Sequence, residues 1–105
     1  MFTMQQILKL YEEGVDVVFE ERPDISNQKG EWDVFSLEVI VFLSTARSKR
    51  DRLLTILHEL RHAAEDLLGF KRLGDGQIEK LADETYDTNP YIIQFVRQLY
   101  PSRHI

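Results

Sequence analysis

The first half of the chain carries hydrophobic side chains first at helical and then at strand spacing. Residues 3–13 have an apolar side chain every three or four positions, which predicts a short helix. Residues 15–20 are β-branched and aromatic, as is typical of a strand. Two further stretches, 32–37 and 38–43, carry strand signal and are expected to be joined by a bend or bulge. The second of them is apolar at nearly every position, as in a strand covered on both faces.

Three helical patterns occupy the second half. The longest lies between Ser48, its expected N-cap, and Gly69, its expected stop. Patterns over 77–86 and 91–100 follow, separated by Pro90. In the longest helix, the following residues form a stripe of 3.6-residue period that is expected to face the core: Leu53, Leu57, Leu60, Ala64 and Leu67.

The run His58-Glu59-Leu60-Arg61-His62 lies in the middle of that longest helix. Residues four apart occupy the same helix face, so His58 and His62 can direct two imidazoles at one metal ion. Glu59 lies beside them, where a carboxylate can take a proton from a metal-bound water. The pattern predicts a zinc hydrolase site with Glu59 as its base. The alternative is a pair of histidines on a helix flank in a protein that holds no metal.

A catalytic zinc usually has three protein ligands and a water, so the two histidines need a partner. Glu79 is the first candidate, because it follows a short connection and lies near the start of the next helix. Asp83 shares its face and is expected to accept the free N–H of a ligating imidazole. Tyr86, a further turn on, is a candidate hydrogen-bond donor to an oxyanion, with an aromatic of the core or rim as the alternative.

Other side chains remain open as the third ligand. Glu84 is the runner-up, rotated by about 100° from Asp83 on a helix. Glu65 shares one straight helix with both histidines and would need a bend to reach the metal. Asp87 and His104 would reach it only if the last segments fold back over the site.

Composition narrows the functional classes. The chain has 105 residues, 43% of them hydrophobic, and is expected to form one domain over residues 1–105. It has no cysteine, so a metal must be held by histidine and carboxylate, which accept iron, cobalt and nickel as well as zinc. A formal net charge of -5 argues against general nucleic-acid binding. Neither a signal peptide nor an apolar run of about 20 residues is visible, so we expect a cytoplasmic protein without a membrane contact.

Cations near the motif have two interpretations each. Segment 47–52 holds four of them, which form either a solvated turn or a contact for an acidic partner. Arg61 can bind a substrate carboxylate, or it can form a salt bridge with Glu65, four residues on.

The region from Val39 to Tyr86 resembles the zincin-like metallopeptidases with a glutamate third ligand, in particular the minimal bacterial and phage domains of the ImmA/IrrE type. The likeness rests on strand 39–43, on the motif at 57–62 and on the pattern Glu79-x-x-Ala82-Asp83. It implies a minimal zincin-like α+β fold, in which a small twisted sheet packs on the motif helix beside C-terminal helices. It also implies that a sheet edge can pair with an extended peptide.

This chain departs from the family pattern in two respects. Arg61 stands where the family often has glycine, and the stretch from His62 to Glu79 is short.

The leading hypothesis is a zinc metallopeptidase-like hydrolase that cleaves a peptide or protein substrate, with His58, His62 and Glu79 as ligands and Glu59 as base. The rival hypothesis is a binding or regulatory module that keeps the zincin scaffold without cutting its partner. Small size favours the rival, whereas the intact Glu59 favours the enzyme. The sequence leaves the oligomeric state open.

Overall fold

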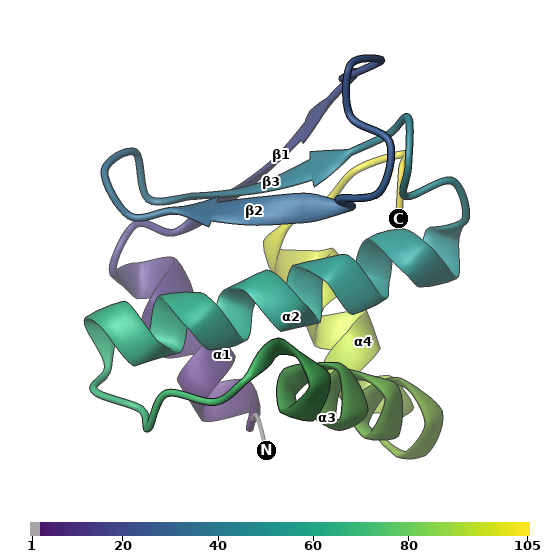
Figure 1. Cartoon of the computed structure of the whole chain (residues 1–105). Helices are drawn as coiled ribbons and strands as arrows, with labels where there is room; N and C mark the ends of the chain where they lie inside the picture. The colour runs from purple at the N-terminus through teal and green to yellow at the C-terminus, as the bar shows by residue number, and fades with distance from the viewer. Residues whose placement is uncertain (1–2) are drawn as a thin grey trace.

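The computed structural model describes residues 3–105, in which a three-stranded sheet packs on four helices (Figure 1). The predicted α+β class is therefore confirmed. Within the described residues, no helix is both long enough and apolar enough to cross a membrane. The elements in chain order are α1 (Met4–Glu12), β1 (Asp16–Glu20), β2 (Gly30–Asp33), β3 (Glu38–Phe42), α2 (Lys49–Leu67), α3 (Asp75–Thr88) and α4 (Pro90–Leu99).

The sheet has the order β1-β3-β2, with β1 parallel and β2 antiparallel to the central β3. The strand expected over 32–37 is shorter than predicted, because β2 ends at Asp33. The Oδ1 atom of Asp33 accepts the N–H groups of Phe35 (2.9 Å) and Ser36 (3.3 Å), which starts a turn. Leu37 then takes a left-handed φ of 58° before β3 begins. The expected bend is therefore a tight hairpin that leaves β2 at the edge of the sheet.

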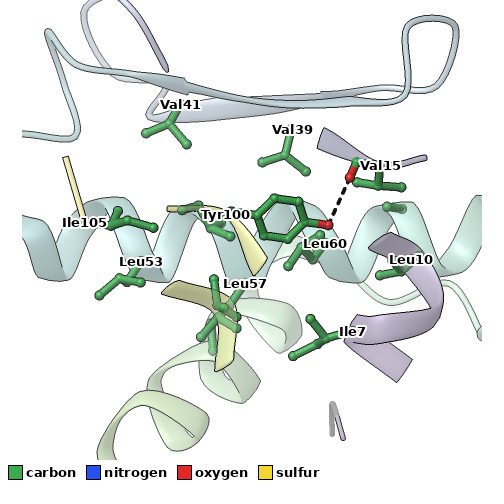
Figure 2. Packing of buried hydrophobic residues seen from close by; sticks show 14 of the residues in the cluster. Ile7, Leu10, Val15, Val39, Val41, Leu53, Leu57, Leu60, Tyr100 and Ile105 are labelled. Carbon is green, nitrogen blue, oxygen red and sulfur yellow. Dashed lines mark hydrogen bonds between the residues drawn. The ribbon is translucent and has the colours of Figure 1, made fainter. Parts of the chain in front are cut away.

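Strand β3 is buried along almost its whole length, as its apolar run predicted. Val39 and Val41, both fully buried, point from the sheet toward α2 (Figure 2). Ile40 and Phe42 alternate with them on the other face and are at most 8% exposed. The guanidinium carbon of Arg22 lies 5.4 Å from the centre of the Phe42 ring.

Helix α2 lies between the sheet on one side and α1, α3 and α4 on the other (Figure 1). Its predicted stripe is buried from Leu53 to Ala64, and Ile56 is equally buried because a second face of the helix is covered. Both predicted ends are confirmed. The Oγ of Ser48 accepts the N–H of Asp51 at 3.0 Å, and Gly69 has a φ of 72° just beyond the helix.

The end of the chain closes the core beneath the sheet. Tyr100 follows α4, and its buried hydroxyl donates to the backbone carbonyl of Val15 at 3.0 Å (Figure 2). This bond joins the start of β1 to the C-terminal helix. Burial is the main cause that raises the pKa of Tyr100 above its usual value.

Gly30 allows β2 to approach α2 closely. A Cβ atom at this position would lie 2.5 Å from Cγ2 of Thr55 and 2.6 Å from the carbonyl oxygen of Ile40. We expect Gly30→Ala to lower the free energy of unfolding by about 1–3 kcal/mol, the usual cost of overpacking. Urea denaturation measures the change. Gly76→Ala is the matched control, because a Cβ there meets nothing within 4 Å, and equal losses in both variants would contradict this account of β2.

Candidate metal centre

A pocket of about 760 Å³ lies over α2, between β2 and α3. Its volume is within the range of roughly 300–1,000 Å³ that is usual for ligand sites. Its walls come from β2 and the loop before it, from α2 and α3, and from Arg72 between these helices. The lining residues are Asn27, Gln28, Lys29, Gly30, Glu31, Trp32, Asp51, Leu54, Thr55, His58, Glu59, His62, Asp66, Arg72, Asp75, Glu79, Ala82 and Asp83.

Both motif histidines direct a nitrogen at one carboxylate oxygen in this pocket. Oδ1 of Asp75 lies 3.2 Å from Nε2 of His58 and 3.0 Å from Nε2 of His62. Asp75 is the first residue of α3, so the loop after α2 brings it back over the histidine turn. Within the described part of the chain, these three side chains form the one group whose ligand atoms all lie within 4.8 Å of one another.

The donor set and the two nitrogen–oxygen separations are compatible with a metal ion such as zinc. Two atoms bound to the same tetrahedral zinc, each at about 2.0–2.1 Å, lie about 3.3 Å from each other. The nitrogen–oxygen separations of 3.2 and 3.0 Å are close to that value. Two imidazole nitrogens and one carboxylate oxygen also match the usual protein ligands of a catalytic zinc. His58, His62 and Asp75 therefore form a group that can hold a metal ion.

The charges of this group favour a cation between its members. Hydrogen bonds from His62 and then His58 hold the pKa of Asp75 below its usual value. Burial acts to lower the pKa of His62, but hydrogen bonds to Glu65 and Asp75 outweigh burial and raise it. Asp75 is thus kept ionised, and the imidazole of His62 binds a proton more tightly than a free imidazole does. A metal cation bound at Nε2 would take the place of that proton.

Glu59 lines the same pocket and is half-buried. Burial raises the pKa of its carboxyl group, although the nearby His58 and His62 act in the opposite direction. A carboxylate with a raised pKa is a stronger base than an exposed one. Its position beside both histidines agrees with the role that the motif predicts.

Glu65 is a buried carboxylate behind His62, with only 2% of its side chain exposed. Its Oε1 atom lies 3.0 Å from Nδ1 of His62, on the side of the ring opposite Asp75. Its Oε2 atom accepts the backbone N–H of Leu73 at 2.9 Å. Burial acts to raise the pKa of Glu65, but these hydrogen bonds and the charges of His62 and Arg61 lower it. Glu65 is therefore an ionised group inside the protein.

Arg61 is the counterion of Glu65, so the salt-bridge interpretation is confirmed. Its Nη1 atom lies 3.3 Å from Oε2 of Glu65, and its Nη2 atom donates to the carbonyl of Lys71 at 2.7 Å. The guanidinium also lies 4.9 Å from the centre of the Phe70 ring. Arg61 is only 8% exposed and does not line the pocket, which leaves it poorly placed to bind a substrate carboxylate.

The other residues predicted for the site lie on α3. Glu79 lines the pocket one turn beyond Asp75, but its carboxylate is not part of the converging group. Asp83 also lines the pocket, and its ion pair is with Arg50 at 3.6 Å. Tyr86 is half-buried beneath the guanidinium of Arg50, at 4.7 Å, and is not among the lining residues.

The remaining ligand candidates lie outside the pocket. Glu84 is exposed on α3, and Asp87 pairs with Arg50 at 3.3 Å. His104 stacks against Phe19 of β1, with the ring centres 4.9 Å apart. The last segments therefore do not bring a side chain to the histidines.

Most cations of segment 47–52 have partners within the chain. Arg50 binds α3, as described above. Arg47 donates to the carbonyl of Ser44 at 3.1 Å, and Arg52 donates to the carbonyl of Ala46 at 2.8 Å. These contacts hold the start of α2 in place, a role that needs no acidic partner.

Asp75 and the bond from Glu65 to His62 were not predicted from the sequence. Asp75 lies four residues before Glu79, so the one-face argument that selected Asp83 downstream also applies to Asp75 upstream. Glu65 lies three residues after His62, a spacing at which helix side chains touch.

Comparison of the chain with protein-family models, curated proteins and solved structures found no match. The functional argument therefore rests on the residues of the pocket.

Proposed function

We propose that this chain is a zinc-dependent peptidase-like hydrolase. The observation that carries the proposal is the convergence of two Nε2 atoms on the Asp75 carboxylate, in a pocket that also holds Glu59. His58, His62 and Asp75 are the proposed ligands. Glu79, the choice made from the sequence, is the alternative third ligand, because it lines the same pocket.

Glu59 is the proposed general base. A zinc ion in this site would polarise a substrate carbonyl and lower the pKa of a water molecule. Glu59 takes a proton from the attacking water and returns it to the leaving amine, a task for which its half-buried position makes it more basic. His58 and His62 would hold the metal through their Nε2 atoms, which already converge on Asp75.

Strand β2 supports a peptide as the substrate. It is an edge strand that lines the pocket, so an extended peptide can add to it through backbone hydrogen bonds. Two contacts attach β2 and the residue before it to α2: Lys29 lies 3.4 Å from Asp51, and the indole N–H of Trp32 donates to Asp66 at 2.8 Å. A peptide paired with β2 would therefore lie at a fixed distance from the two histidines of α2.

The first prediction concerns zinc content and affinity. Wild-type protein is expected to bind one zinc per chain, and His62→Ala is expected to lose it. Asp75→Asn should weaken binding by more than the roughly 10–100-fold that is typical of residues outside the ligand set. Metal analysis after dialysis and competition with a chromophoric chelator measure both quantities.

Glu79→Gln and Glu84→Gln complete this comparison. Glu84 is exposed and outside the pocket, so its variant should bind zinc like the wild type. A larger loss in Glu79→Gln than in Asp75→Asn would make Glu79 the third ligand, as the resemblance implies. Equal, near-zero zinc in the wild type and His62→Ala under metal-replete conditions would refute the metal centre.

The second prediction separates an enzyme from a binding module. Glu59→Gln keeps the size and polarity of the side chain but cannot accept the proton. We expect zinc content and folding to be preserved, while peptide turnover falls by at least ~10², the scale of a lost general base. Cleavage of a mixture of synthetic peptides, followed by mass spectrometry, measures turnover.

Glu84→Gln again serves as the control and should cleave at the wild-type rate. If zinc-loaded wild type cleaves no peptide, or if Glu59→Gln cleaves as fast as wild type, the hydrolase proposal fails. The scaffold would then act as the binding module that is its rival.

A further inference from the structure

We propose that Glu65 is a positioning residue that couples the orientation of His62 to the placement of the loop that delivers Asp75. This inference rests on the proposed metal centre. Glu65 does not contact the metal in this proposal. It acts through two separate hydrogen bonds, one accepted by each of its carboxylate oxygens.

The first bond sets the ring of His62. Oε1 of Glu65 lies 3.0 Å from Nδ1, and Oδ1 of Asp75 lies 3.0 Å from Nε2 of the same ring. An ionised acceptor at Nδ1 keeps a proton on that nitrogen, so a metal ion would bind at Nε2, in place of the proton shared with Asp75. The same anion makes the imidazole a stronger ligand.

The second bond fixes the loop between α2 and α3. Oε2 of Glu65 accepts the N–H of Leu73, which lies two residues before Asp75. Arg61 adds a neighbouring attachment, because it binds both Oε2 of Glu65 and the carbonyl of Lys71. The path of the loop into α3 is thus tied to the same helix that carries both histidines.

The two carboxylate oxygens of Glu65 have different partners, which distinguishes Glu65 from a carboxylate that only forms an ion pair. Arg61 contacts Oε2, which leaves Oε1 to His62. Arg72 lies farther off, at 3.6 Å from Oε1, and its shorter contact of 2.6 Å is with Asp66. Arg61 supplies the positive charge that allows Glu65 to stay ionised in the interior. Glu65 therefore links a metal ligand on one side to a loop on the other.

Glu65→Gln tests this role, because an amide has one acceptor oxygen and one donor nitrogen. The variant cannot accept from both His62 and Leu73, so one of the two attachments is lost. Arg61→Gln is the comparison variant: it breaks the same buried ion pair and the attachment of the loop at the Lys71 carbonyl, but it leaves both carboxylate oxygens, and so the bond to His62, in place. Chelator competition gives zinc affinity, the visible spectrum of the cobalt-substituted protein reports ligand geometry, and urea denaturation reports the stability of the metal-free protein.

We expect Glu65→Gln to weaken zinc binding roughly 10–100-fold and to change the cobalt spectrum. Arg61→Gln should destabilise the metal-free protein to a similar degree, but it should weaken zinc binding by less than Glu65→Gln does, because His62 keeps its Nδ1 partner. Equal losses of zinc affinity in the two variants, or no loss in Glu65→Gln, would overturn the inference. Asp83→Asn should bind zinc like the wild type, because Asp83 forms its ion pair with Arg50 and not with a histidine. A loss larger than that of Glu65→Gln would transfer the role to Asp83 and overturn the inference.

Nitrogen NMR of the zinc-loaded wild type, labelled at histidine, covers the case in which Glu65→Gln does not fold. The expected spectrum has a protonated Nδ1 and a metal-bound Nε2 at His62, whereas a metal-bound Nδ1 would refute the role of Glu65. Failure of the proposed function is distinguishable, because it appears in the wild type itself, as absence of zinc or as absence of peptide cleavage by the zinc-loaded protein.

Discussion

The enclosure of α2 between the sheet and the other three helices is the constraint on which the rest of the structure depends. Leu53, Leu57 and Leu60 are buried in the core, and Ile56 is buried on a second face of the helix. Polar groups of α2 can reach the pocket only from the strip of this helix that the sheet and the other helices leave uncovered. His58, Glu59 and His62 occupy that strip. The packing that buries the rest of the helix therefore also directs these three side chains into the pocket.

Local patterns were sufficient to predict much of this arrangement. The helix of the motif, its Ser48 cap and its Gly69 stop follow from periodicity and capping chemistry, which act over a few residues. The apolar run of β3 predicted a strand covered on both faces for the same reason. The bend was expected near residue 37 but starts after Asp33, because a side-chain bond to two backbone N–H groups interrupts residues that otherwise have strand character.

The partners of the histidines depend on the path of a loop, which no local pattern specifies. Residues 68–74 turn back along α2 because Arg61 holds the carbonyl of Lys71 and Glu65 holds the N–H of Leu73. This return brings Asp75 to the imidazoles and leaves Glu79 one turn away. The sequence showed that α3 has an acidic face. Which carboxylate of that face lies nearest the histidines depends on contacts of the loop with Arg61 and Glu65, which are distant from α3 in the sequence.

Trp32 lines the pocket, and this position makes the pocket accessible to fluorescence measurements. It is the only tryptophan of the chain, and its indole N–H is bonded to Asp66 on α2. Indole fluorescence depends on the polarity and hydrogen bonding around the ring. The emission of this protein therefore arises beside the candidate metal centre, and the chain carries its own optical reporter of whatever enters the pocket.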